Sequence, residues 1–395
     1  MEIEFKIFTL NCWGIPVIAR NLADRIEAIG NFLAESEYDC VCLQEVWTES
    51  LFENIKRKVS KKLPYGHYFF SGSFGSGICM LSKYPIVDVY FHQWAVNGYI
   101  HKIHHGDWFG GKGVGLCKLK VDNYYVNVYT AHLHAEYNRE CDEYMAHRVI
   151  QAFDTAQFIH FTSGGVDLVV LAGDLNTEPG DLAYRLLLTV PGLTDSFVKA
   201  QISEGIKSTT NESRNNSYTS SSLKKRDACG KRIDHIMYHP GSNLQVFLKK
   251  YDLPLEDRVP NKRFSYSDHE AISAILHING DMASPAADNT TERILVLKES
   301  IDVLEKEMNN LKSHKRFYWL CGIFPFCLLL ITIFVDVPSS FTIPYNIFRT
   351  ILTMLALFFI SMATIWNRIE RSGVISSLLS MRILLERLSN EKSKI

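Results

Sequence analysis

The chain has 395 residues, 47% hydrophobic and 22% charged, which suits one large globular domain with a membrane-associated appendage. A formal net charge of −1 argues against a broad nucleic-acid-binding surface, because such surfaces are normally basic. The nine cysteines include no CxxC pair, so they predict neither a zinc site nor a disulfide framework and are typical of a reducing compartment.

The first 280 residues alternate between strand-like and helix-like segments. Strands are expected at residues 3–11, 38–43, 77–81, 115–121, 124–130 and 168–171, and helices at 22–34 and 141–162. Polar side chains suited to acid–base or metal chemistry stand at or near the ends of apolar runs, and these are Asn11, Glu45, His132, Asp174, Asn176, Asp234 and His269. Side chains at strand ends can build one site from distant parts of the sequence, so we expect a single hydrolytic site.

The segment 110–115 is rich in glycine and contains Lys112. It looks like a phosphate-cradling loop, but it fits neither the GxGxxG nor the P-loop spacing and has no Ser or Thr after the lysine. We therefore expect a flexible hinge or a tight hairpin at this position.

The last third of the chain has a membrane-protein pattern. Residues 294–311 and 378–388 carry apolar side chains at heptad spacing, and the stretches 317–335 and 350–366 are uncharged and of membrane-spanning length. The predicted boundaries are a catalytic domain at 1–280, a linker at 281–291, a helix at 292–316, membrane spans at 317–335 and 347–366 around a loop at 336–346, and a helix at 367–395.

Basic residues flank the two predicted spans on their outer sides. Lys312, Lys315 and Arg316 precede the first span, and Arg368 and Arg371 follow the second. Because positively charged flanks favour the cytosolic side, we expect a two-pass hairpin with the catalytic domain and both termini in the cytosol. The endoplasmic reticulum or another cellular membrane is compatible with this pattern.

The residue types at the strand ends predict metal-assisted hydrolysis of a phosphoester. A single glutamate with an Asn or Asp oxygen suits Mg²⁺, which binds through one or two carboxylates and keeps several waters. Such a cation neutralises charge on a phosphodiester and polarises water. A histidine with an aspartate partner accepts a proton from water near neutral pH, while amide and imidazole donors hold the non-bridging phosphate oxygens.

Six short segments resemble motifs of the endonuclease/exonuclease/phosphatase superfamily and, within it, of the membrane-bound animal neutral sphingomyelinases. They are residues 10–16, 45–47, 103–109, 130–139, 173–176 and 267–271. The resemblance spans residues 5–278 and, in architecture, the C-terminal tail. It implies an α/β fold, a four-layered α/β sandwich like that of DNase I, with a C-terminal transmembrane helical hairpin. It also implies Mg²⁺-dependent hydrolysis of sphingomyelin, a membrane lipid, to ceramide and phosphocholine.

The resemblance implies the roles of the metal and proton-transfer residues. Glu45 is similar to the Mg²⁺ ligand of the family, with Asn11 beside it. His269 is similar to the general base that activates water, and Asp234 to the carboxylate that orients this base. The residues alone leave a structural alternative for Asn11, which is to cap the turn before Gly14.

The resemblance also implies which residues handle the phosphate. Asp174 and Asn176 are similar to the pair that positions water and grips the phosphate, and His132 to the histidine that contacts it. Asp107 and Lys112 have the spacing of the Asp–Lys switch of neutral sphingomyelinases, which makes Lys112 a candidate substrate-binding residue.

Several alternatives stay open on the sequence alone. The sequence pattern fits equally well an enzyme of the same fold that acts on inositol-phosphate sphingolipids or lyso-phospholipids, because no motif identifies the headgroup. A catalytically inactive membrane scaffold is disfavoured by the intact set of polar residues. The remaining histidines His104, His105 and His134 are expected to make structural hydrogen bonds. The C-terminal helices are candidates for pairing with each other or for homo-oligomerisation.

Overall fold

The structure is a computed structural model that describes residues 3–102, 105–201, 209–225, 230–241, 244–279 and 289–393. The chain divides into two compact units. The first unit comprises Met1–Gly98 and His105–Val296, and the second comprises Tyr99–His104 and Leu297–Ile395.

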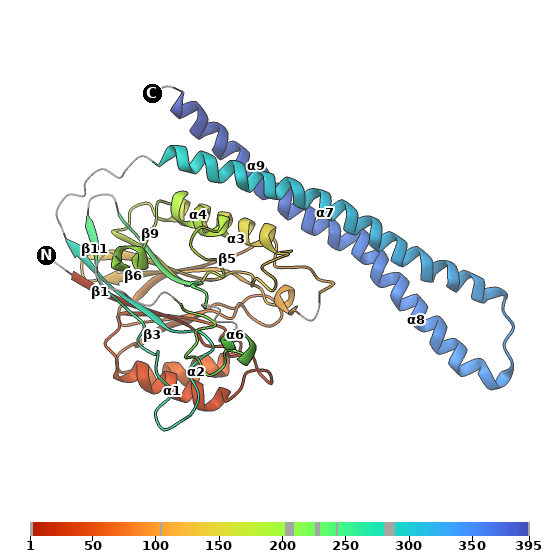
Figure 1. Ribbon diagram of the computed structural model, residues 1–395, viewed down its shortest axis with the longest axis horizontal. Coiled ribbons are helices and arrows are strands. Elements are labelled where there is room, and N and C mark those ends of the chain that lie inside the picture. Colours follow the sequence, from red (N-terminus) through yellow and green to blue (C-terminus); the bar gives the residue numbers. More distant parts are fainter. Residues whose placement is uncertain are drawn as a thin grey trace. The chain divides into compact units, whose positions relative to one another are not determined.

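The first unit is built on two six-stranded sheets, in the orders β11-β12-β1-β2-β4-β3 and β5-β6-β7-β8-β10-β9 (Figure 1). The strands are β1 Ile3–Asn11, β2 Cys40–Gln44, β3 Tyr65–Tyr68, β4 Cys79–Ser82, β5 Ile86–Gln93, β6 Gly113–Val121, β7 Tyr124–His132, β8 Leu168–Asp174, β9 Thr194–Asp195, β10 Asp234–Pro240, β11 Gln245–Asp252 and β12 Ile272–Asn279. The helices are α1 Leu22–Glu35, α2 Glu49–Val59, α3 Met145–Thr162, α4 Leu182–Thr189, α5 Ser196–Gln201 and α6 Ser221–Lys225, with a short 3₁₀ turn, η2, at Asp107–Phe109.

Strand β1 carries apolar side chains on both faces. Phe5 and Ile7 enter a core cluster that contains residues of both sheets, whereas Phe8 and Leu10 enter a second cluster with side chains of α1 and α2. This two-residue alternation is the period of a strand, and burial on both faces marks β1 as central. The two sheets therefore share a core, and α1 and α2 cover the outer face of the first sheet. Figure 1 shows α3 and α4 on the opposite side of this unit.

The strand pairing brings distant polar residues to one end of the sheets. β1 runs parallel to β2, with Asn11 opposite Gln44. β7 runs parallel to β8, with His132 opposite Asp174, and β10 begins antiparallel to β8, with Asp234 also opposite Asp174. Because parallel neighbours end at the same sheet edge, these registers fix which polar side chains meet.

Most of the predicted elements of the first unit are confirmed, with ends that shift by a few residues. Several elements were not predicted, and they are β3, β5, β9, β10, β11, β12, α2, α4, α5 and α6. α2 buries Phe52, Ile55 and Val59 at helical spacing, but it is short and highly charged, and the apolar residues of β5 include the half-exposed Val87 and Val89. The eight cysteines in the described ranges are free.

The expectation of a flexible hinge or tight hairpin in the glycine-rich segment was wrong. Gly110 pairs with Gly72 in an isolated β-bridge, and Gly113 begins β6. A Cβ atom on Gly111 would lie 2.3 Å from the main-chain nitrogen of Gly72, so glycine is needed for this close approach of two backbones. The packed segment leaves Lys112 only 2% exposed.

The second unit consists mainly of a helical hairpin. Its helical segments are α7 Thr290–Ile331, of which the residues from Leu297 onward belong to this unit, then η3 Thr332–Phe334, η4 Ser339–Phe341, α8 Thr342–Ser361, the π-helical η5 Met362–Trp366 and α9 Asn367–Lys392. In this unit the hydroxyl group of Tyr99 donates to Oε1 of Glu307 at 2.9 Å. The hydroxyl of Tyr318 lies 2.6 Å from Nδ1 of His101, so Tyr99 and His101 pack against α7.

The two heptad seams pack against each other within this chain. Their buried residues are Leu297, Ile301, Leu304 and Leu311 of α7 and Leu378, Met381 and Leu388 of α9. Arg382 donates to Glu305 at 2.6 Å, and the amide of Asn367 donates to the carbonyl of Leu311 at 2.9 Å. Pairing of the two helices, one of the two outcomes expected, therefore occurs in the monomer.

Two helical segments in the described part of the chain, Thr290–Phe334 and Ser339–Lys392, are long and apolar enough to cross a membrane. Large apolar side chains in the predicted spans point outward, and among them are Leu320, Phe324, Phe334, Met354 and Leu357. Helices with this outward apolar surface suit a lipid environment better than water.

Candidate active site

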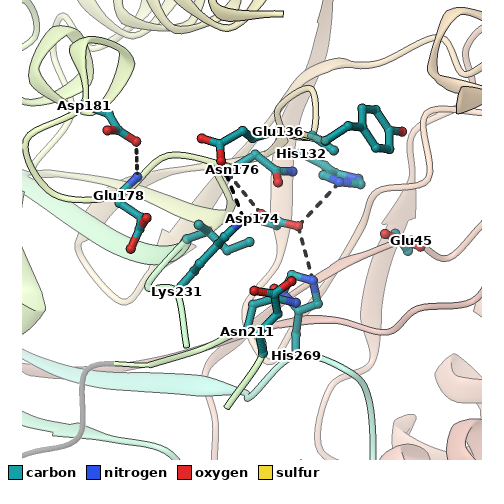
Figure 2. A pocket seen from close by; sticks show the side chains of 14 residues that line it. Glu45, His132, Glu136, Asp174, Asn176, Glu178, Asp181, Asn211, Lys231 and His269 are labelled. Atoms are coloured by element: carbon teal, nitrogen blue, oxygen red, sulfur yellow. Dashed lines mark hydrogen bonds and ion pairs between the residues drawn. The ribbon is translucent and has the colours of Figure 1, made fainter. Parts of the chain in front are cut away.

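The polar strand ends of the first unit surround a cavity of about 220 Å³. Its lining is Glu45, His132, Ala135, Glu136, Tyr137, Asp174, Asn176, Glu178, Asp181, Asn211, Glu212, Lys231, Ile233 and His269. Figure 2 shows Asp174 between His132 and His269, with Glu45 on the far side of His132. Five of the seven side chains predicted from the strand ends line this space, and the other two, Asn11 and Asp234, contact lining residues.

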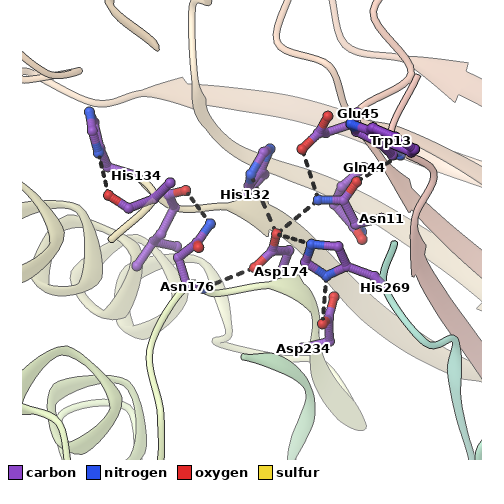
Figure 3. A network of polar contacts seen from close by, with 12 residues as sticks. Asn11, Trp13, Gln44, Glu45, His132, His134, Asp174, Asn176, Asp234 and His269 are labelled. Carbon is purple, nitrogen blue, oxygen red and sulfur yellow. Dashed lines mark hydrogen bonds and ion pairs between the residues drawn. The ribbon is translucent and has the colours of Figure 1, made fainter. Parts of the chain in front are cut away.

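Glu45 and Asn11 meet because β1 and β2 end side by side. The amide Nδ2 of Asn11 donates to Oε1 of Glu45 at 3.0 Å and to Oδ2 of Asp174 at 2.9 Å (Figure 3). Glu45 has a left-handed backbone with φ 54°, and its carbonyl accepts from the main-chain N–H of Gly14 at 2.9 Å. A Cβ on Gly14 would lie 2.3 Å from that carbonyl oxygen, so the tight turn requires glycine.

The second carboxylate oxygen of Glu45 fits a bound cation. Oε2 is buried and has no hydrogen-bond partner among the described residues. Burial, and then the nearby carboxylate of Asp268, raise the pKa of Glu45, and a cation would offset both effects. The amide oxygen of Asn11 is engaged elsewhere in this arrangement, because its Oδ1 accepts a hydrogen bond from the N–H of Trp13 at 2.9 Å. As a ligand, Asn11 would have to turn this oxygen toward the ion.

His269 lies between two carboxylates. Its Nδ1 is 2.9 Å from Oδ2 of Asp234, and its Nε2 is 3.8 Å from Oδ2 of Asp174. Burial alone would lower the pKa of His269, but the carboxylates of Asp234 and Asp174 outweigh it and raise this pKa well above its ordinary value. The ring is therefore oriented through one nitrogen and presents the other to the cavity wall.

Asp174 is the centre of the polar network. Its Oδ1 accepts from the main-chain N–H of Asn176 at 3.0 Å. Burial and the nearby carboxylate of Asp234 raise the pKa of Asp174. Asn176 has a left-handed backbone with φ 43°, and its amide donates to the carbonyl of Leu133 at 3.0 Å. This turn places Asn176 in the cavity wall, next to Asp174.

Asp174, Asp234 and His269 also have ligand atoms within 4.8 Å of one another, which is compact enough for a metal ion. The contacts favour a different role. His269 uses Nδ1 for Asp234 and directs Nε2 toward Asp174, so a cation among the three would have to displace the histidine from its oriented position. Glu45, with its unpaired buried oxygen, is the better site for a cation.

His132 and Lys112 form the second polar side of the site. The Nζ of Lys112 lies 2.6 Å from Oδ1 of Asp107 and 3.5 Å from Nε2 of His132. Burial, and then the charge of Lys112, lower the pKa of His132 well below its ordinary value, which keeps this imidazole neutral. His132 lines the cavity, whereas Lys112 is almost fully buried and approaches the site through His132.

Sequence reasoning missed part of the cavity wall. The missed polar lining residues are Glu136, Tyr137, Glu178, Asp181, Asn211, Glu212 and Lys231. Only Glu136 and Tyr137 stand inside a recognised segment, 130–139, and Tyr137 donates from its hydroxyl to Oδ2 of Asp107 at 2.6 Å. The others lie on loops, where no periodic pattern marks them. The bridges from Asn211 to Lys231 and to His269 bring one of these loops to the site.

Gln44 is a further residue whose role the sequence did not indicate. Its amide Nε2 donates to Oγ1 of Thr9 at 3.0 Å and to Oγ1 of Thr130 at 3.1 Å. Thr130 belongs to the other sheet, so Gln44 ties β2 to β7 just before Glu45 and His132. The sequence shows Gln44 only as a polar residue at the end of an apolar run.

The expected structural role of the extra histidines is supported where they are described. Nδ1 of His134 lies 2.9 Å from the carbonyl oxygen of Ala135, and its ring stacks on Tyr144. His105 lies 2.6 Å from the hydroxyl of Tyr144. The expectation for His104 falls outside the described residues.

Residues 8–269 match the Endonuclease/Exonuclease/phosphatase family. A Drosophila melanogaster protein named "Putative neutral sphingomyelinase" is 37% identical, with 97% of each chain covered. The Homo sapiens protein "Sphingomyelin phosphodiesterase 2" is 41% identical over 70% of this chain and 65% of its own length. "Inositol phosphosphingolipids phospholipase C" of Schizosaccharomyces pombe is 30% identical over 70% of this chain and 69% of its own length.

Solved structures share the fold of the first unit. Sphingomyelinase C from Streptomyces griseocarneus has a TM-score of 0.52 at 17% identity, covering 69% of this chain and 99% of its own. A beta toxin variant from Staphylococcus aureus with bound magnesium ions has a TM-score of 0.51 at 17% identity, with the same coverage. At this identity the likeness establishes the fold.

Proposed function

Because this chain belongs to the endonuclease/exonuclease/phosphatase family and, within it, to the neutral sphingomyelinases, we propose that it hydrolyses sphingomyelin to ceramide and phosphocholine. The observation that carries the proposal is the arrangement of His269 and Glu45 in one cavity. Asp234 orients His269. One carboxylate oxygen of Glu45 is buried and has no hydrogen-bond partner among the described residues. A phosphodiesterase needs a base for water and a cation for the phosphate, and this cavity suits both.

In the proposed reaction His269 is the general base. Its Nε2 takes a proton from a water molecule near Asp174, while Asp234 holds Nδ1 and stabilises the imidazolium that forms. The water oxygen bonds to phosphorus, the bond between phosphorus and the ceramide oxygen breaks, and the ceramide oxygen takes up a proton from solvent, to which His269 returns the proton that it took. Asp174 accepts from Asn11 and Asn176, so it is held in place beside the attacking water.

Neutral donors suit the phosphate oxygens in this mechanism. His132 is uncharged, and its Nδ1 has no hydrogen-bond partner among the residues that the structure describes. Nε2 of His132 lies 3.5 Å from both Nζ of Lys112 and Oδ2 of Asp174, and we propose that the ring carries its proton on the other nitrogen, Nδ1. That N–H and the amide of Asn176 are the proposed donors to the non-bridging oxygens, with Lys112 adding positive charge behind His132.

A divalent cation is part of the proposal, and Mg²⁺ is the ion we propose. Glu45 would hold it, with Asn11 beside Glu45. When bound, the ion would neutralise negative charge on the phosphodiester in the transition state. One carboxylate and an amide oxygen form the sparse oxygen donor set that Mg²⁺ accepts, since it keeps several of its waters.

The charge of the cavity favours a zwitterionic substrate over one with an anionic headgroup. Six of the lining residues are carboxylic acids, Glu45, Glu136, Asp174, Glu178, Asp181 and Glu212, and Lys231 is the lysine among them. Arg139 and Arg148 offset part of this charge through Glu178 and Glu136. The choline group of sphingomyelin brings its own positive charge into such a cavity, whereas an inositol phosphate brings none. We therefore place inositol-phosphate sphingolipids second.

The two apolar helices suit an enzyme whose substrate lies in a bilayer. We propose that they span the membrane as a two-pass hairpin, with the catalytic domain in the cytosol, because the basic residues flank the spans on their outer sides. Homo-oligomerisation through these helices is not needed to bury the two seams, which already pack within one chain.

The proposed function is tested with sphingomyelin labelled in its headgroup and dispersed in detergent micelles. The expected result is release of labelled phosphocholine with Mg²⁺ and loss of release when the metal is chelated. Inositol-phosphate ceramide and lyso-phosphatidylcholine serve as competing substrates in parallel assays. Turnover of either of these with sphingomyelin left intact would contradict the proposal.

A further inference from the structure

Arg25 in the first turn of α1 is the bulkiest fully buried side chain in the described part of the chain, with 0% exposure. The hydrogen bonds of its guanidinium group go to main-chain carbonyl oxygens. Nε donates to Arg20 at 2.9 Å, and Nη2 donates to Trp13 at 2.7 Å. Nη1 donates both to Cys12 at 2.7 Å and to Tyr266 at 3.1 Å. A buried charge is costly unless it is hydrogen-bonded, so an arginine held by carbonyls suggests a specific task.

The carbonyls that Arg25 binds belong to two segments of the active site. Cys12 and Trp13 directly follow Asn11, and Tyr266 stands three residues before His269. The register between β1 and β12 ends at Thr9 and Ile272, so no strand pairing joins the two backbones beyond that point. Arg25 spans this gap from outside the cavity. Figure 3 shows Trp13 and His269 on opposite sides of Asn11.

A second contact crosses the same gap. The hydroxyl of Ser267 donates to the carbonyl oxygen of Asn11 at 2.6 Å. The carbonyl of Ser267 in turn accepts from the amide of Asn216 at 2.9 Å. Two aromatic rings close the other side of the arginine, since the guanidinium lies 5.0 Å from the ring centre of Trp13 and 5.7 Å from that of Tyr218. These contacts hold the guanidinium in one orientation.

We propose that Arg25 is a positioning residue of the active site, which fixes the metal-binding side, carried by Asn11 and Glu45, against the loop that carries His269. The inference rests on the proposed hydrolysis, because its kinetic readout is that reaction. The planar fork of arginine reaches carbonyls of several segments at once, whereas the single ammonium of lysine cannot span them. Loss of the fork lets the two segments shift relative to each other, and misplacement by about 1 Å can cost about 10²-fold in rate.

The test compares Arg25→Lys and Arg25→Met in the full-length protein with a matched control, Ile29→Ala. Ile29 lies on the same helix and is equally buried, but it belongs to the apolar cluster under the first sheet. We expect Arg25→Lys to lower kcat by about 10- to 100-fold with little change in KM, because the reacting groups lose their orientation while the substrate still binds. Calorimetry with Mg²⁺ alone should show weaker binding in the same variant, while Ile29→Ala loses thermal stability but keeps kcat.

A folded Arg25→Lys protein with the kcat and Mg²⁺ affinity of the parent would overturn the inference, as would an equal loss of kcat in Ile29→Ala. If neither Arg25 variant folds, Ser267→Ala decides, because it removes the bond to Asn11 across the same gap, together with the local contacts of this hydroxyl with Asp268 and His269, without exposing a buried charge. A reduced kcat in Ser267→Ala supports the inference and an unchanged kcat refutes it. Failure of the proposed function is distinct, since the parent protein would then bind Mg²⁺ and leave sphingomyelin intact.

Discussion

Oδ2 of Asp234 and Nδ1 of His269 are 2.9 Å apart, although 35 residues separate the two in the sequence. Asp234 is 1% exposed and begins β10, whose register places it opposite Asp174. The histidine therefore receives one carboxylate from the strand neighbour of Asp174 and faces Asp174 itself with its other nitrogen. This arrangement separates the group that orients the base from the group beside the water.

The base and its carboxylate partner should act as a unit. We expect His269→Ala to lower kcat by about 10²–10⁴-fold, because a positioned base supplies that much. Asp234→Asn keeps the size of the side chain but loses the charge that favours the imidazolium. The double variant should then be little worse than His269→Ala alone. Steady-state kinetics on micelles measure all three, and strict additivity of the two effects would contradict the assigned roles.

The pH dependence of the reaction should report the pKa of His269. The base must be unprotonated to act, and its carboxylate neighbours raise its pKa above the ordinary value of about 6.5. We therefore expect kcat/KM to rise with pH through a limb above that value. Asp234→Asn removes a carboxylate that raises this pKa, so the limb should move to lower pH. A limb that stays in place in Asp234→Asn would show that another group controls the profile.

Glu45→Gln should abolish tight Mg²⁺ binding. The change keeps the shape of the side chain and removes the charge that the cation needs, at a cost of several kcal/mol of transition-state stabilisation. Calorimetric titration and activity across Mg²⁺ concentrations both measure the effect. Glu49→Gln is the control, because this exposed residue begins α2 four residues away. Normal turnover of Glu45→Gln at low Mg²⁺ would place the ion elsewhere.

Removing acidic charge from the cavity should weaken the preference for a choline headgroup. We expect the double change Glu136→Gln and Glu178→Gln to lower the ratio of kcat/KM for sphingomyelin over inositol-phosphate ceramide. Two partly exposed charges of this kind are worth about 1 kcal/mol, which is about fivefold. Glu140→Gln, at an exposed position close in sequence, is the control. An unchanged ratio would mean that the headgroup is selected by shape.

The orientation of the hairpin predicts which parts of the chain a protease can reach. With both outer flanks in the cytosol, protease added to sealed microsomes should destroy the catalytic domain and spare only the segment around Pro338. Immunoblotting with a tag in that loop measures the protected fragment. Protection of the catalytic domain would show that it faces the lumen and that the predicted orientation is reversed.

The strands that carry the site were predictable because each is a short apolar run, and the residue after such a run is visible in the sequence. That is why Asn11, Glu45 and Asp174 were identified before their registers were known. The sequence could not show that the carbonyls of Cys12 and Tyr266 meet at one arginine, because nothing in α1 distinguishes Arg25 from a surface residue. It is a contact between remote segments, and no local period encodes it.

The loops are a second part of the site that could not be predicted from the sequence. Asn211 and Lys231 belong to segments with loop composition, and their place in the cavity wall depends on bridges to His269 and to each other. The prediction for the glycine-rich segment 110–115 was wrong for a related reason. Its glycines serve a close approach to Gly72, almost 40 residues earlier, and a free hinge and a tightly packed crossing look alike in sequence.

The left-handed backbones of Glu45 and Asn176 place local backbone strain at the reaction centre. A non-glycine residue in that conformation costs about 1–2 kcal/mol, and Glu45 also keeps a carboxylate oxygen without a partner among the described residues. Glycine at either position would relax the backbone and remove the chemistry. Selection for thermal stability alone would therefore favour replacement of these two residues. The same few residues thus lower the stability of the fold and provide its activity.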